Sequence, residues 1–273
     1  MNAIALTIFD QFKLLYFLVE RELKGRYSRS PIGVLSAIAE PLAVLLILTV
    51  VFTQIRMRNV ALGDYLLLFF STGYLPLHCF KAGASSAYLA FNRNRKLLFV
   101  SKFSPMYLFI TGGTVMLFVM TALMTLIVLG FIMLYSVEPP KNIAICLLVF
   151  MLNNIMGFSI GAFNSWVATR FPYWITIFSI LTAPLIILSG VFYTAETINK
   201  SALQYLEWNP FFHSTELFRE NFFYGYTSPI ASWPYYGGTV LVLLCVGLLA
   251  ERFGRRGLMR QALSRGVDPR TWR

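Results

Sequence analysis

Long runs of apolar residues alternate with short polar segments along most of the chain. A helix needs about 20 predominantly apolar residues to cross the hydrocarbon core of a bilayer, and six runs approach or exceed that length. These predicted spans are residues 32–52, 65–91, 106–135, 143–169, 173–193 and 233–253. The pattern predicts an all-α integral membrane protein with six transmembrane helices, and an even number of spans places both termini on one side.

Lysine and arginine are unevenly divided between the two sides that these spans define. The side with the termini carries Lys13, Arg21, Lys24, Arg26, Arg29, Arg93, Arg95, Lys96, Lys102, Arg170, Arg252, Arg255, Arg256, Arg260, Arg265, Arg270 and Arg273. The opposite loops carry Arg56, Arg58, Lys141, Lys200 and Arg219. Because positive charge favours the cytoplasmic side, we expect both termini in the cytoplasm. The net charge of +11 then follows mainly from topology, and no nucleic-acid partner is expected.

Composition argues against a soluble domain and against a catalytic or metal site. Hydrophobic residues make up 57% of the chain and charged residues 13%, too apolar a balance for a surface that faces water. Cys79, Cys146 and Cys245 each fall inside a predicted span without CxxC spacing, so neither a disulfide framework nor a metal cluster is expected. A transferase acting on lipid-linked sugar would need an acid/base constellation, yet the chain has no Asp-x-Asp motif and only two histidines.

Residues 1–30 precede the first span and have a helical periodicity of their own. Apolar positions recur at spacings of four, three, four and four, at Ile8, Phe12, Leu15, Val19 and Leu23. This pattern predicts an amphipathic helix that lies in the cytoplasmic headgroup layer and ends near Gly25. Such a helix either anchors the first span or docks beside a partner.

Three segments carry motifs on consistent sides of the predicted membrane. Residues 21–33 read Arg-Glu-Leu-Lys-Gly-Arg-Tyr-Ser-Arg-Ser-Pro-Ile-Gly, followed by Glu40-Pro41-Leu42; residues 189–193 read Ser-Gly-Val-Phe-Tyr; residues 209–219 read Asn-Pro-Phe-Phe-His-Ser-Thr-Glu-Leu-Phe-Arg. Together they resemble the ABC-2 type polysaccharide export permeases. The Asn-Pro-x-x-His form and the compact length are most similar to the transmembrane subunit of Gram-negative capsular polysaccharide ABC transporters. O-antigen and teichoic acid permeases are the alternative.

The resemblance implies a transport subunit that works with other proteins. It implies a homodimer in the bacterial inner membrane, with the polymer path between protomers, energised by two copies of a separate cytoplasmic ABC ATPase. The implied cargo is a lipid-linked anionic capsular polysaccharide. Further implied partners are an inner-membrane polysaccharide co-polymerase and an outer-membrane export channel. ATP and Mg²⁺ would be bound by the ATPase, and no cofactor is expected in this chain.

The residues themselves also predict that nucleotide is bound elsewhere. A Walker A loop ends in Gly-Lys-Ser/Thr, but none of the seven lysines follows a glycine. The cytoplasmic loop after the second span, residues 92–98, begins with cations and ends with apolar residues, which suits a short helix seated in a partner's groove. Stop-transfer charge alone would also explain its cations. The resemblance implies that this loop is the ATPase-coupling helix, formed by Arg93, Arg95, Lys96, Leu97 and Leu98.

Two charged residues lie inside predicted spans, where a charge costs at least ~2.5 to 3.5 kcal/mol at mid-bilayer. Glu40 precedes Pro41, and Lys81 follows Pro76 by five residues, so both helices are expected to be kinked or locally opened. Glu40 and Lys81 either pair inside the bundle, or Lys81 lines a wet path for an anionic substrate. The alternative is that they reach out to an interface.

Three aromatic residues and one cation lie close together in the sequence at one predicted cytoplasmic turn: Trp166, Arg170, Tyr173 and Trp174. Most aromatics near a membrane surface belong to the interfacial belt of any membrane protein. A polysaccharide path, however, also needs flat apolar faces along which sugar rings slide while their hydroxyls stay hydrated. These four residues are therefore candidates for the cytoplasmic entrance of the path.

Residues 194–232 form the longest external segment, which Asn209-Pro210 divides in two. Its second part mixes phenylalanines with charges, which predicts two short re-entrant helices in the outer leaflet. Glu216 and Arg219, at spacing three, are expected to pair along one helix and, with Asn209 and Pro210, to form an external gate. An interfacial anchor without a gating role is the alternative. The transmembrane domain then covers residues 31–253, and residues 254–273 form a basic cytoplasmic tail suited to anionic lipid or to the ATPase.

Overall fold

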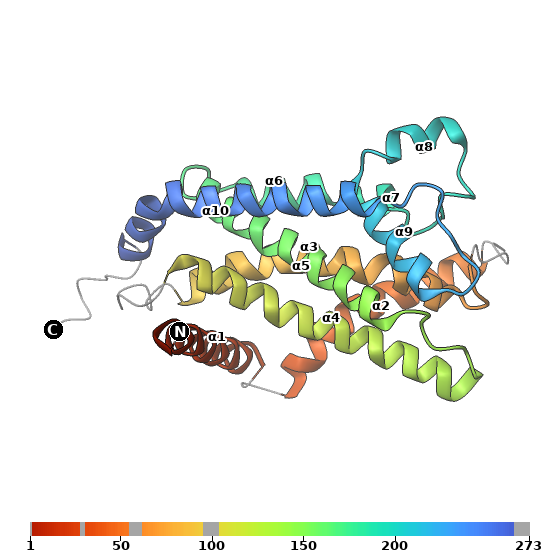
Figure 1. The fold of residues 1–273 in the computed structure, drawn as a ribbon, viewed down its shortest axis with the longest axis horizontal. Coiled ribbons are helices and arrows are strands. Elements are labelled where there is room, and N and C mark those ends of the chain that lie inside the picture. The colour runs from red at the N-terminus through yellow and green to blue at the C-terminus, as the bar shows by residue number, and fades with distance from the viewer. Residues whose placement is uncertain (1, 28–30, 55–61, 95–103, 265–273) are drawn as a thin grey trace.

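The computed structural model describes residues 2–27, 31–54, 62–94 and 104–264, and every regular element in these ranges is a helix (Figure 1). The helices are α1 (Asn2–Tyr27), α2 (Pro31–Gln54), α3 (Leu66–Asn94), α4 (Pro105–Tyr135), α5 (Ile143–Ala168), α6 (Trp174–Thr182), α7 (Leu185–Leu188), α8 (Lys200–Leu206), α9 (Pro210–Phe222) and α10 (Trp233–Ser264). Figure 1 shows α1 and the last turns of α10 at one end of the bundle, and α8 and α9 at the other. The prediction of an all-α fold is confirmed.

Among the described residues, three helices are both long and apolar enough to cross a membrane. They are Pro105–Tyr135, Ile143–Ala168 and Trp233–Gly254, with mean hydropathies of 2.7, 2.2 and 1.6. Ile38–Gln54 and Trp174–Leu188 are shorter apolar helices. This set of apolar helices is typical of an integral membrane protein.

Helix α3 is at the centre of the bundle, packed against α4 and α5 along most of its length. Its polar side chains find partners inside the protein: the Ser71 hydroxyl donates to Leu68 O at 2.7 Å, and the Ser86 hydroxyl to Gly112 O at 2.7 Å. Because protein surrounds it, α3 does not need the uniformly apolar surface of a helix that faces lipid. This explains why α3 is less apolar than α4 and α5.

Glycines let α4 and α5 approach α3 closely. A Cβ atom added at Gly112 would lie 2.5 Å from Ser86 O, and one at Gly157 would lie 2.7 Å from Phe80 O. Small residues at such crossings are the usual means of packing helices in membranes, where lipid is as apolar as the side chains. The Asn154 amide adds a hydrogen bond from α5 to Gly113 O of α4, at 2.7 Å.

Helix boundaries agree with the predicted spans over 32–52, 65–91, 106–135 and 143–169, and differ elsewhere. The predicted span 173–193 is not one helix, because α6 ends at Thr182 and α7 begins at Leu185. Pro184 explains the break, since proline lacks an N–H donor and its ring clashes with the carbonyl four residues earlier. Helix α10 continues past residue 253 to Ser264, and α1 continues past Gly25 to Tyr27.

Helix α1 packs one edge against the same end of the bundle from which α4 starts. Leu18 is buried there with Phe91 of α3 and Phe109 of α4. Tyr16 and Phe17, on other sides of the helix, are exposed. The apolar stripe predicted for residues 1–30 is half-buried at Leu15, Val19 and Leu23, and the side chains of Ile8 and Phe12 lie outside the described set. Helix α1 thus has one face on protein and another that is uncovered, as expected for an interfacial helix.

Candidate functional site

Asn209 and Pro210 start α9 and also attach it to the end of α7. The Asn209 carboxamide oxygen accepts a hydrogen bond from Phe211 N at 3.0 Å, and Pro210 occupies the first turn, where a missing N–H costs nothing. The Asn209 amide group donates to Leu188 O at 2.8 Å. This pair therefore sets both the beginning of α9 and its position beside the broken helix α6–α7.

Arg219 is completely buried, and each of its guanidinium nitrogens donates a hydrogen bond. Nη1 donates to Gly190 O at 2.7 Å and to Tyr193 O at 2.6 Å, Nη2 to Val191 O at 3.1 Å, and Nε to the Thr72 hydroxyl of α3 at 3.4 Å. The guanidinium also lies 4.1 Å from the centroid of the Phe69 ring, within the range of a cation–π contact. One side chain of α9 thereby links α3 to residues 190–193.

Gly190 makes this arrangement possible. Its φ of +70° belongs to the left-handed region that glycine adopts without strain, and a Cβ there would lie 2.5 Å from the Phe212 ring. Any larger residue would therefore be strained and would collide with α9. The turn at Gly190 brings the carbonyls of Gly190, Val191 and Tyr193 to one guanidinium.

Glu216 supplies the negative charge of this cluster. One carboxylate oxygen accepts hydrogen bonds from the Tyr226 hydroxyl and, at 2.7 Å, from the Ser228 hydroxyl; the other lies 3.6 Å from Arg219 Nη1. Burial, and then the Glu216 charge, raise the pKa of Tyr226. Burial lowers the pKa of Arg219 to about 10 against the opposing effect of Glu216, so the guanidinium stays charged at neutral pH.

The predicted pairing of Glu216 with Arg219 along one helix is confirmed, and both side chains are fully buried. A charge pair withdrawn from water needs further hydrogen bonds to offset its desolvation, and the residue 190–193 carbonyls and the Tyr226 and Ser228 hydroxyls supply them. In this geometry the two charges fix α9 in place. Neither charge faces a solvent-filled channel.

Of the four residues predicted at the cytoplasmic entrance, the structure brings three together through a cation–π contact and through tilted and edge-on ring contacts with Phe163. The Arg170 guanidinium lies 5.5 Å from the centroid of the Trp166 ring, and Phe163 packs between Trp166 and Trp174 at centroid distances of 5.9 and 6.3 Å. The Trp174 indole N–H donates to Asn164 Oδ1 at 2.9 Å. Tyr173 is 81% exposed, and Arg170 is also exposed.

Glu40 and Lys81 do not form an ion pair within the part of the chain that the structure describes. Glu40 is exposed on α2, whereas Lys81 is half-buried on α3. One turn before Lys81, His78 Nδ1 contacts the Tyr74 hydroxyl at 3.2 Å, and the two rings stack. The structure therefore gives no support to a pair between Glu40 and Lys81, while a wet path and an interfacial position for Lys81 stay predictions.

The predicted coupling segment is only partly described. Arg93 donates to Glu22 of α1 at 2.5 Å, and the neighbouring Asn94 amide donates to the other Glu22 oxygen at 2.7 Å. Arg95, Lys96, Leu97 and Leu98 lie outside the described residues. Glu22 is almost completely buried, so α1 is attached to the end of α3 just where the predicted coupling segment begins.

Several of these partners were not predicted from the sequence. Glu22 lies 71 residues from Arg93, and the carbonyls around Gly190 lie 26 to 29 residues from Arg219. Main-chain acceptors leave no residue-type signature, and no periodicity connects α1 to α3. The Asn-Pro pair and the spacing of Glu216 and Arg219 were the only local signals for this cluster.

Comparison with known proteins gives consistent matches over most of the chain. The family model described as ABC-2 type transporter matches residues 13–223. The capsule polysaccharide export inner-membrane protein CtrC of Neisseria meningitidis serogroup A is 27% identical over 95% of this chain and 94% of its own length.

Two further relatives have names that state similar roles. The polysialic acid transport protein KpsM of Escherichia coli is 29% identical over 85% of this chain and 90% of its own length. The capsule polysaccharide export inner-membrane protein BexB of Haemophilus influenzae is 24% identical over 95% of this chain and 94% of its own length. The resemblance inferred from the three motifs is confirmed, and the chain belongs to the ABC-2 type transporter family.

Proposed function

We propose that this protein is the permease subunit of a bacterial inner-membrane ABC transporter that exports a lipid-linked anionic capsular polysaccharide. The observation that carries the proposal is the near full-length similarity to relatives named for capsule polysaccharide export and polysialic acid transport. The family match supports a transport role for the chain. Energy then comes from a separate ATPase subunit, which binds ATP and Mg²⁺.

In the proposed arrangement, α2, α3, α4, α5, the broken helix α6–α7, and α10 cross the membrane, with both termini in the cytoplasm. Helices α8 and α9 enter the outer leaflet without crossing it. The distribution of lysine and arginine along the sequence supports this orientation. Two copies of the chain enclose the polymer path, and Lys81 and the cluster at Trp166, Arg170, Tyr173 and Trp174 meet the anionic polymer.

The proposed coupling surface is the segment that begins at Arg93. Its attachment to α1 through Glu22 supports the idea that the ATPase acts on α1 and α3 together. An inner-membrane co-polymerase and an outer-membrane channel complete the proposed export route, because a polymer released at the inner membrane must still cross the envelope.

The test is reconstitution of the full chain with its ATPase in proteoliposomes. Stimulation of ATP hydrolysis by an anionic capsular glycolipid, and not by a neutral glycolipid of the same lipid tail, is the expected result. Preference for a neutral O-antigen glycolipid would reassign the cargo. Export that persists without any ATPase subunit would overturn the transporter class.

A further inference from the structure

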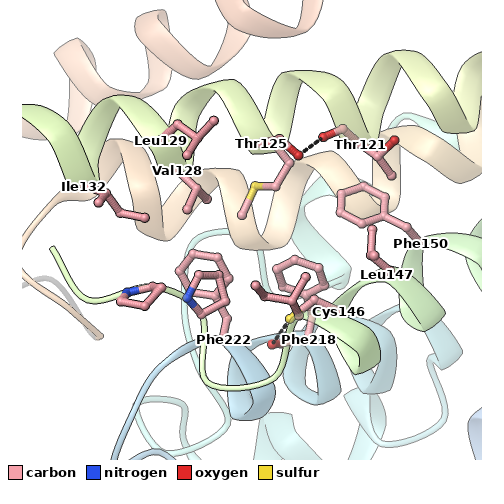
Figure 2. A pocket seen from close by; sticks show the side chains of 14 residues that line it. Thr121, Thr125, Val128, Leu129, Ile132, Cys146, Leu147, Phe150, Phe218 and Phe222 are labelled. Atoms are coloured by element: carbon pink, nitrogen blue, oxygen red, sulfur yellow. Dashed lines mark hydrogen bonds between the residues drawn. The ribbon is translucent and has the colours of Figure 1, made fainter.

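A cavity of about 320 Å³ lies between α4, α5 and α9 (Figure 2). Its wall on α4 runs from Thr121 to Ile132, its wall on α5 from Ile143 to Phe150, and Phe218 and Phe222 of α9 close the third side. Figure 2 shows these side chains pointing into one space, with Leu129 and Ile132 of α4 on one side and Phe218 and Phe222 on the other. The lining is almost entirely apolar.

The few polar atoms in the wall are already hydrogen-bonded within the protein. The Thr121 hydroxyl donates to Leu117 O and the Thr125 hydroxyl to Thr121 O, both at 2.8 Å. The Cys146 thiol lies 4.0 Å from Phe218 O. A water molecule needs two to four polar partners, and apolar cavities of about 150 Å³ in proteins stay dry and take up benzene or xenon. This larger cavity therefore favours an apolar occupant over water.

The mouth of the cavity opens toward the outside of the bundle. Leu129, Ile143 and Leu147 at its rim are exposed. Helices α4 and α5 are long and apolar enough to cross a membrane, so in the proposed arrangement acyl chains surround this rim. In the proposed orientation, the cavity lies in the half of the bilayer nearest the α4–α5 loop, which is the outer leaflet.

We propose that an acyl chain of a membrane phospholipid occupies this cavity as a bound ligand. Lipid is as apolar as the wall, so binding is driven by the dispersion contacts that a flexible chain gains on filling a void. A sugar would leave its hydroxyls without partners there, which excludes the polymer itself. The inference requires that α4 and α5 cross the bilayer, its assignment to the outer leaflet rests on the proposed orientation, and it is independent of the cargo.

The bound chain would contact the helix that carries Glu216 and Arg219. Phe218 precedes Arg219 on α9, and its ring packs edge-on against Phe150 at a centroid distance of 5.5 Å. An acyl chain in the cavity therefore supports the lipid side of α9, while residues 190–193 hold its other side. The ligand class assigned to the site is a diacyl phospholipid of the outer leaflet.

The experiment uses the full-length protein with its ATPase in nanodiscs that contain a phospholipid with a photoreactive diazirine halfway along one acyl chain. Crosslinks are mapped by mass spectrometry. We expect labelling of residues 121–132 and 143–150 on the order of fivefold above the exposed apolar face of α10 at Leu241 and Val242, consistent with modest packing energies inside membranes. If the wild-type protein is labelled uniformly on all lipid-facing helices, that result by itself overturns the proposal.

Two variants of α4 sharpen the result. Thr125→Trp fills the cavity and is expected to abolish the enrichment at residues 143–150. Leu126→Trp places the same ring one residue further on, at an exposed position that does not line the cavity, and is expected to leave the enrichment intact. Equal labelling in both variants would contradict a bound chain. Loss of label on addition of the glycolipid cargo would assign the cavity to that cargo instead.

Discussion

Arg219 and Arg170 both lie beside an aromatic ring, but their environments are opposite. Arg219 is fully buried, makes four hydrogen bonds and lies 4.1 Å from the Phe69 centroid. Arg170 is exposed and lies 5.5 Å from the Trp166 centroid, and within the described ranges its guanidinium has no hydrogen bond or ion pair. A buried cation whose three nitrogens all donate hydrogen bonds holds the fold together, whereas an exposed cation with unused donors remains available to an anionic ligand.

The largest expected effect is loss of the folded state on replacing Arg219. Arg219→Ala leaves Glu216 charged and buried without a cation, and removing one partner of a buried pair costs about 3 to 5 kcal/mol. We expect little folded protein in detergent, measured by thermal unfolding and by yield after size-exclusion chromatography. Glu216→Gln is the milder control, because its amide oxygen still accepts from Tyr226 and Ser228. Equal melting temperatures for Arg219→Ala and wild type would contradict the structural role.

The charge-reversed pair gives a separate test of the same cluster. In the double variant Glu216→Arg with Arg219→Glu, a carboxylate would face the carbonyls of Gly190, Val191 and Tyr193, none of which can donate a hydrogen bond. We therefore expect no recovery of folded protein relative to Arg219→Ala. Recovery would mean that the ion pair, and not the main-chain acceptors, determines the stability of this cluster.

A smaller effect is expected where α1 meets α3. Glu22→Ala leaves the buried Asn94 amide without its side-chain acceptor, at a cost of about 1 to 3 kcal/mol, while the half-exposed Arg93 regains water. The expected result is faster proteolysis of α1 with the rest of the bundle intact. Glu20→Ala is the matched control, because its pair with Lys24 is exposed and its loss should have little effect. Identical digestion patterns for the two variants would refute the attachment.

Lys81 should affect transport more than folding. If Lys81 faces the anionic polymer, as proposed, Lys81→Glu should lower export strongly and Lys81→Arg should largely preserve it, measured as surface polysaccharide per cell. Since Glu40 is exposed and unpaired with Lys81 among the described residues, exchanging the two charges is expected to give no rescue. Restored export in the exchanged variant would assign Lys81 to a structural pair instead.

The smallest effect on stability is expected at Arg170. Surface substitutions of this kind usually change stability by less than about 0.5 kcal/mol, so Arg170→Glu should melt like wild type. Its export should nevertheless fall, because the charge presented beside Trp166 is reversed. Arg252→Glu is the control, as another exposed cation at the same end of the bundle. Equal export by both variants would remove Arg170 from the polymer path.

The sequence predicted the helices of this fold better than their contacts. Apolar runs mark α2 to α5 within a few residues, because a helix that crosses a membrane needs about 20 predominantly apolar residues. This length criterion does not detect the break between α6 and α7, because Pro184 lies within an uninterrupted apolar run. The pair Glu216–Arg219 was predictable from spacing, but its main-chain partners were not, because any residue type supplies a carbonyl. The cavity beside α9 arises from helices placed in three dimensions and has no linear motif.

The break at Pro184 has a mechanical consequence. Leu188 O at the end of α7 accepts a hydrogen bond from Asn209, and the Gly190, Val191 and Tyr193 carbonyls in the turn that follows accept from Arg219, so this part of the chain is joined to α9 at four points. The helix is interrupted between Thr182 and Leu185, whereas the chain beyond the break is held by these four hydrogen bonds. If α6 tilts during the proposed transport cycle, we expect the bend to occur at this break, while the end of α7 stays with α9 on the opposite side of the membrane.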